Sequence, residues 1–143
     1  REARKYLESL SVDEETISHV CEIIDNISFK GAGAEAPMIT LEGRAVRDAD
    51  RLDALGAIGI ARCFAYGGSK NRPIYDPDIK FELHQTKDEY AKRQTTSINH
   101  FYEKLLLLKD LMLTNAGRRI AEERHDFMKE YLDRFYKEWN GDE

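Results

Sequence analysis

The chain has 143 residues, a length that suits one compact domain, and we predict a single domain over residues 1–143. Hydrophobic residues make up 41% and charged residues 34%, a balance typical of a globular protein with a hydrophobic core. The net charge of −5 argues against nucleic acid as a partner, and no apolar run in the sequence is long enough to cross a membrane.

The first part of the chain predicts two helices. Residues 1–10 carry apolar side chains at helical spacing, and Ser11 with Glu14 has the form of a capping box that opens a second helix. This second helix is expected to end soon after Asn26, where glycines and a proline follow. Its predicted buried stripe consists of Ile17, Val20, Ile24 and Ile27.

A third helix is predicted over residues 41–66, with Thr40 as its cap. Gly56 and Gly59 lie inside it, although a glycine in a helix costs about 1 kcal/mol relative to alanine. Two such glycines predict that another backbone packs very close at this point. Gly67-Gly68 is expected to end the helix in the left-handed conformation.

A polar loop is predicted over residues 69–79, followed by a helix over residues 87–112 and a last helix capped by Thr114 or Asn115. The last helix carries a wide apolar face, made of Ile120, Phe127, Met128, Tyr131, Leu132, Phe135, Tyr136 and Trp139. No segment is rich in β-forming residues, so the predicted fold class is all-α, a helical bundle.

Cys21 and Cys63 lie in apolar helical patterns and do not have the spacing of a zinc site. We expect both to be free thiols, which is typical of a protein in a reducing compartment. The charged start of the chain also lacks the apolar stretch of a secretory signal. Together these features favour a cytoplasmic location.

Three aspartates, Asp48, Asp50 and Asp53, fall within one short segment of the third predicted helix. Asp50 and Asp53 share a helix face, whereas Asp48 lies roughly 200° around the helix from Asp50. A buried carboxylate needs a cation, a metal or several hydrogen-bond donors. Two interpretations stay open from the residues alone. One is surface ion pairing with neighbouring arginines (Arg44, Arg47 and Arg51), and the other is a cation site.

Residues 46–68 resemble a signature of small, uncharacterised bacterial hydrolases of the HD superfamily, and residues 23–31 and 41–43 resemble the same proteins. The resemblance implies a helical bundle of the HD type. It also implies a metal-dependent phosphohydrolase that acts on nucleotides or other phosphate esters and anhydrides. The implied cofactor is a divalent metal, Mn²⁺ or Mg²⁺, which polarises phosphate oxygens and activates a water.

Members of this superfamily bind the metal through a His, a His-Asp pair and a more distant Asp in an Ala-Asp-Arg/Lys-Leu setting. Ala49-Asp50-Arg51-Leu52 matches that setting, so the resemblance assigns Asp50 as a metal ligand. This role requires the Asp50 carboxylate to be buried and aimed at a cation-binding hollow. The His and the His-Asp pair should precede the Ser11 helix, and we therefore expect an N-terminally incomplete domain that by itself binds metal weakly.

Lys30 and Asp53 are candidates for substrate binding, Lys30 as a cation for phosphate and Asp53 as an orienting carboxylate. The catalytic residues stay unassigned. The literal His125-Asp126 pair follows Asp50 along the chain, and we interpret it as a coincidence on a solvated face. The expected partner is a small phosphorylated substrate. The alternative function is a non-catalytic helical module for interaction or homodimerisation, suggested by the apolar last helix.

Overall fold

The computed structural model describes residues 2–27, 37–38, 40–83 and 95–142. Its elements are the α-helices α1 (Glu2–Ser9), α2 (Glu14–Ile27), α3 (Leu41–Leu52), α4 (Gly56–Ser69), α6 (Ser97–Glu103) and α7 (Asn115–Asn140), with the 3-10 helix η1 (Leu105–Leu111). The described residues contain no strand, which confirms the all-α prediction. None of the described helices is both long enough and apolar enough to cross a bilayer.

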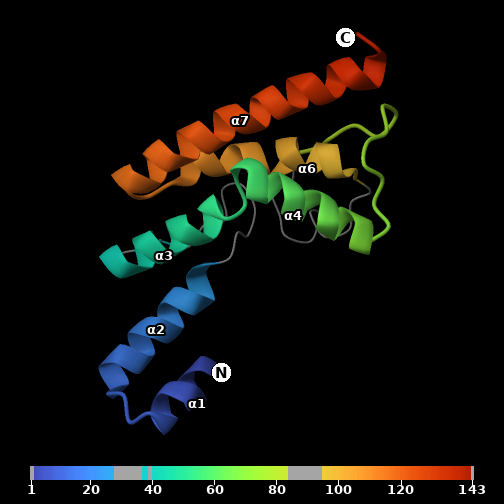
Figure 1. Ribbon diagram of the computed structural model, residues 1–143. Helices are drawn as coiled ribbons and strands as arrows, with labels where there is room; N and C mark the ends of the chain where they lie inside the picture. Colours follow the sequence, from blue (N-terminus) through green and yellow to red (C-terminus); the bar gives the residue numbers. More distant parts are fainter. Residues whose placement is uncertain (1, 28–36, 39, 84–94, 143) are drawn as a thin grey trace.

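The helix α7 is the organising element of the core. It packs against α3, α4 and η1. Figure 1 shows α7 lying along the part of the molecule formed by α3, α4, α6, η1 and α7, which we call the body. The core consists of Leu55, Ile60, Cys63, Ile98, Phe101, Leu105, Leu108, Met112, Ala121, Met128 and Leu132. The predicted apolar face of α7 is therefore confirmed at Met128 and Leu132, whereas Phe127 and Trp139 are 47% and 52% exposed.

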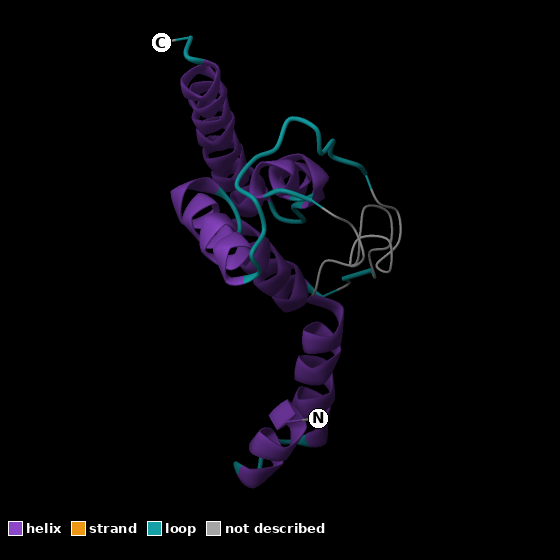
Figure 2. Cartoon of the chain, turned by 90° about the vertical axis from the view of Figure 1, so that its right-hand side faces the viewer, coloured by secondary structure: helices purple, strands orange, loops and turns teal. Residues whose placement is uncertain are grey.

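The first two helices form a hairpin that projects from this body (Figures 1 and 2). The helix α1 packs on α2, and α2 packs on α3. No side chain of α1 is buried, and Tyr6 and Leu10 are 66% and 57% exposed. The predicted stripe of α2 is confirmed at Ile17, but Ile24 is exposed and Ile23 is buried in its place. Val20 and Ile27 are half-buried, so the predicted stripe is confirmed only in part.

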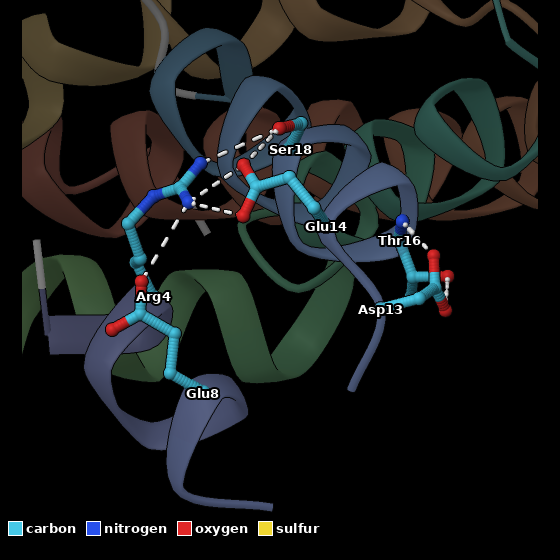
Figure 3. A network of polar contacts seen from close by, with 6 residues as sticks. All are labelled: Arg4, Glu8, Asp13, Glu14, Thr16 and Ser18. Carbon is cyan, nitrogen blue, oxygen red and sulfur yellow. Dashed lines mark hydrogen bonds and ion pairs between the residues drawn. The ribbon is translucent and has the colours of Figure 1, made fainter. Parts of the chain in front are cut away.

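The predicted cap of α2 at Ser11 is wrong. Ser11 belongs to the turn after α1, because its amide donates to the carbonyl of Glu8 and its φ is +56°. Asp13 caps α2 instead: its two carboxylate oxygens accept from the Thr16 amide and the Thr16 hydroxyl, each at 2.8 Å (Figure 3). The carboxylate of Glu14, expected to close the capping box, accepts from Arg4 at 2.8 and 2.9 Å.

The helix predicted over residues 41–66 is divided into α3 and α4. The division falls at Gly56, whose φ of +70° is strained for any residue with a Cβ. At Gly59 a Cβ would collide with the carbonyl oxygen of Ala54. The predicted close packing of another backbone at these two glycines is therefore wrong: the atoms nearest to Gly59 belong to the turn just before α4, and those nearest to Gly56 are side-chain atoms of Arg124 in α7.

The end predicted for this segment at Gly67-Gly68 is also wrong, because α4 continues to Ser69. Gly67 is required by packing rather than by a cap: a Cβ there would collide with the Ser97 hydroxyl of α6. The non-helical chain that follows begins at Lys70, and Asn71 takes a positive φ of +52°. The loop predicted over residues 69–79 is otherwise confirmed.

The helix predicted over residues 87–112 is wrong in its described part, where it is divided into α6 and η1. Residues 87–94 lie outside the described residues. The division occurs at Lys104, whose φ of −144° is not helical. Thr96 caps α6, and Thr114 caps α7 by accepting from the Gly117 amide at 3.0 Å. Of the two residues predicted to cap the last helix, Thr114 is therefore confirmed and Asn115 is the first residue of the helix itself.

Candidate functional site

Asp48 is the buried acid of α3, with 2% of its surface exposed. One carboxylate oxygen accepts from the Leu113 amide at 2.9 Å. The other accepts from the Thr114 amide at 2.8 Å and from the Thr114 hydroxyl at 2.7 Å. These donors lie at the N-terminus of α7, the positive end of the helix dipole. Three hydrogen bonds therefore stabilise the buried carboxylate.

Arg47 and Arg51 lie on the same buried side of α3, each 3% exposed. Arg47 donates to the carbonyl of Asn26 at 2.7 Å, which joins α3 to the end of α2. Arg51 donates to the carbonyl of Leu111 at the end of η1. The interpretation of these two arginines as surface partners of the aspartates is wrong, because both side chains are buried. In this position they join α3 to its neighbours.

Asp53 ends α3, and its carboxylate pairs with Arg62 of α4. The guanidinium of Arg62 also donates to the backbone carbonyl of Asp53 at 3.1 Å. Both side chains are more than half exposed. The interpretation that Asp53 pairs at the surface with Arg47 or Arg51, one of the two left open, is wrong: its partner is Arg62, because the break at Gly56 brings α4 next to the end of α3.

Asp50 lies on the exposed side of α3 beside Val46 and Ala49, which are also exposed. No hydrogen bond or ion pair joins it to another residue in the part of the chain that the structure describes. The expectation that the Asp50 carboxylate is buried is therefore wrong. The reason is the rotation of α3, which turns Arg47, Asp48 and Arg51 inward and leaves Asp50 outside.

A divalent metal needs several ligands, and the described residues provide only part of a site. Among them, no three His, Cys, Asp or Glu side chains gather closely enough to hold an ion. Asp50 offers one carboxylate, a ligand type that suits hard divalent cations. The substrate-binding candidate Lys30 lies outside the described residues. The described chain thus fits one ligand of a metal centre rather than a complete centre.

The His125-Asp126 pair lies on α7. Asp126 is exposed as expected, but His125 is half-buried, and its Nδ1 is buried with no hydrogen-bond partner among the described residues. Burial, followed by the charge of Lys109, holds the pKa of His125 below its ordinary value. Both cysteines are free thiols as expected, although only Cys63 is buried and Cys21 is half-buried; burial raises the pKa of Cys63 to about 11.

The role of Asp48 was missed by the sequence-based reasoning. A partial signal exists, since Thr114 opens a helix whose first amides need acceptors, and a carboxylate in an apolar helix needs donors. The two segments are 65 residues apart, however, and no local pattern connects them.

Comparisons with known proteins show which proteins this chain is similar to. No family model matches the chain. The uncharacterised protein YpgQ of Bacillus subtilis is 40% identical over 132 residues, which cover 91% of this chain and 56% of YpgQ. A crystal structure of YpgQ in complex with ADP superposes with a TM-score of 0.72, at 35% identity over 96% of this chain and 62% of that structure.

Two further solved structures agree with this result. A Bacillus thuringiensis protein described as an HD-superfamily hydrolase is 50% identical, with a TM-score of 0.69 over 95% of this chain and 60% of that one. Lin1889 of Listeria innocua is 36% identical, with a TM-score of 0.75 over 97% of this chain and 67% of that one. The chain spans 56–67% of the length of these relatives. By its identity to them, the chain belongs to the family of these bacterial proteins, and its helical fold is that of the HD superfamily.

Proposed function

We propose that these residues form part of an HD-type domain of a metal-dependent phosphohydrolase, whose substrate is a nucleotide or another small phosphate ester or anhydride. Two relatives support this proposal: one is described as an HD-superfamily hydrolase, and another was crystallised with ADP. Because the chain spans only part of the length of those relatives, the activity is proposed for the full-length protein.

The observation that carries the proposal is that Asp48, Asp50 and Asp53 differ in whether their carboxylates have partners. Asp48 is occupied by three hydrogen-bond donors, and Asp53 is occupied by Arg62. Asp50 alone among them has no partner within the described residues, and it lies in the Ala-Asp-Arg-Leu setting. A carboxylate can bind a metal only if its oxygens are available, so Asp50 is the ligand we propose.

The proposed metal is Mn²⁺ or Mg²⁺, and when bound it would polarise phosphate oxygens and activate a water. Asp50 would supply one ligand, and residues outside the described part of the protein would supply the others. Lys30 is proposed to contact the substrate phosphate. Asp53 lies three residues from Asp50 on the same side of α3, and we propose that Arg62 holds it at the edge of the substrate site.

The test is an Asp50→Asn substitution in the full-length protein, with Mn²⁺ affinity measured by calorimetry and nucleotide hydrolysis measured in parallel. Loss of a direct ligand should weaken both by more than about 100-fold, since even outer partners of a metal ligand contribute about 10- to 100-fold. Asp133→Asn, an exposed aspartate of α7, is the matched control and should change neither. Full Mn²⁺ affinity and activity in Asp50→Asn would overturn the assignment.

The second candidate, a module for interaction or homodimerisation, is favoured by the projecting hairpin. Tyr6, Leu10 and Ile24 are large apolar side chains that are 66%, 57% and 48% exposed. Large apolar side chains that are exposed to water are a feature of many interfaces. The face of α7 that suggested this function in the sequence is divided: Met128 and Leu132 lie in the core, whereas Phe127 and Trp139 are exposed. Light scattering would support the module if the protein is a dimer and if the double variant Tyr6→Ser, Ile24→Ser is a monomer. Calorimetry should then also show that the protein does not bind Mn²⁺.

A further inference from the structure

We propose that Asp48 is a positioning residue: with Arg51 it fixes the rotation of α3 about its own axis and thereby sets the direction in which the Asp50 carboxylate points. This inference rests on the proposed metal-binding role of Asp50. Asp48 itself would not touch the metal or the substrate, because its oxygens are already occupied by the N-terminus of α7.

Asp48 and Arg51 hold the same short segment between η1 and α7 from two points on α3. Asp48 accepts the amide hydrogens of residues 113 and 114, and Arg51 donates to the carbonyl of residue 111. The two side chains are 2% and 3% exposed, so water does not compete for these bonds. A helix held at one point can roll, whereas two anchors almost one turn apart oppose rolling.

The Asp48 carboxylate also has no free space on the α7 side. A Cβ on Gly117 would collide with one of its oxygens, which means that the α7 backbone lies directly against the carboxylate. The Thr114 hydroxyl donates to Asp48 at 2.7 Å and accepts from the Gly117 amide at 3.0 Å. A shift of the carboxylate would break its bonds to the residue that caps α7, so the position of α3 is tied to the first turn of that helix.

The consequence for Asp50 follows from helix geometry. Asp50 lies roughly 200° around α3 from Asp48, on the side away from these anchors. A roll of roughly 10° would move a carboxylate that extends beyond the helix backbone by on the order of 1 Å. Metal–ligand distances vary by only about 0.2 Å in a good site. A small loss of control over the rotation of α3 should therefore weaken metal binding measurably.

The first test compares Asp48→Asn with Asp13→Asn in the full-length protein. The two aspartates are a matched pair, because Asp13 also accepts from the amide and the hydroxyl of one threonine, but on α2 and in an exposed position. We expect Asp48→Asn to lower the Mn²⁺ affinity about tenfold, as loss of an outer partner of a ligand does, and Asp13→Asn to leave it unchanged. Calorimetry at a temperature where both variants are folded measures this difference. Equal affinities would overturn the proposal.

A milder pair of variants covers the case in which Asp48→Asn does not fold. Thr114→Val removes the hydroxyl bond to Asp48 and leaves its two amide bonds, and Thr114→Ser keeps all three. We expect the affinity to fall in Thr114→Val and to be restored in Thr114→Ser. An unchanged affinity in Thr114→Val, together with faster hydrogen exchange at the Leu113 amide, would show a purely structural role and overturn the proposal.

The outcome for Asp50 separates this inference from the proposed function. If Asp50→Asn leaves Mn²⁺ affinity unchanged, both the metal role of Asp50 and the positioning role of Asp48 are overturned. If Asp50→Asn abolishes binding while the Asp48 and Thr114 variants bind normally, the proposed function stands and only the positioning role is overturned.

Discussion

Asp13 and Asp48 perform the same chemistry in two different regions of the molecule. Each accepts hydrogen bonds from the backbone amide and the hydroxyl of one threonine near the start of a helix. Asp13 does so three residues from its threonine and in contact with water, whereas Asp48 does so 66 residues away and with 2% of its surface exposed. Asp13 therefore stabilises the start of one helix, whereas Asp48 joins two helices.

The regions around these aspartates are stabilised differently. In the projecting hairpin, Arg4 pairs with Glu14 at 2.8 Å and with Glu8 at 3.7 Å, all at the surface (Figure 3). In the body, Asp48 and Arg51 are buried between α3 and α7. Surface pairs are screened by salt and compete with water, whereas a buried group that loses its partner bears the full desolvation cost. The stability of the hairpin should therefore depend on pH and salt. The stability of the body should depend on the volume of its buried side chains and on whether its buried donors have acceptors.

The largest difference in stability between the two regions should come from replacing each capping aspartate by alanine. Asp48→Ala leaves the amides of Leu113 and Thr114 buried without their acceptor, and we expect a loss of about 3 kcal/mol in the free energy of unfolding. Asp13→Ala should cost clearly less, because water can replace the exposed carboxylate. Urea unfolding of both variants measures the difference. Equal losses would show that the buried and the exposed cap are energetically equivalent and would break the comparison.

Two glycine-to-alanine substitutions in the body should change the free energy of unfolding by smaller amounts and in opposite directions. Gly117→Ala should destabilise the protein by about 1–2 kcal/mol, because the new methyl group collides with the Asp48 carboxylate, although alanine is intrinsically the better helix former. Gly68→Ala in α4 is the control, since no atom lies within 4 Å of its Cβ position, and it should stabilise by about 1 kcal/mol. Thermal unfolding measures both. A stabilising Gly117→Ala would show that the carboxylate can move.

The smallest effect is the pH response of the hairpin. The side-chain hydrogen bond from Arg4 lowers the pKa of Glu14, and the backbone hydrogen bond from Thr16 lowers the pKa of Asp13. Because both pKa values are lower in the folded hairpin than in the unfolded chain, these acids stabilise the hairpin above about pH 4. That contribution is lost as the pH falls through the folded pKa values.

Hydrogen exchange of the α1 and α2 amides measures this loss, and protection should decrease between about pH 5 and pH 3 while the core of α7 is still protected. Arg4→Met should remove the part of the response that belongs to Glu14. Added salt should weaken it in the same direction. A hairpin whose protection is independent of pH over this range would show that its ion pairs contribute nothing measurable.

The errors in the sequence-based predictions have physical causes that can be named. Ser11 and Asp13 are both good capping residues two positions apart, and the turn that follows α1 decides between them. The apolar pattern continues across Gly56, so periodicity alone gives one helix where the chain bends into two. Thr114, by contrast, caps a helix through its own neighbours, and a local pattern was sufficient to find it.

The sequence by itself determined the all-α class and limited the cap of the last helix to Thr114 or Asn115, because both follow from composition or from residues within a few positions. It also determined that Asp48 and Asp50 lie on different sides of one helix. Only the tertiary structure decided which of them is buried. Helical periodicity gives the angle between two side chains, but the rotation of the helix toward its neighbours depends on donors 65 residues away.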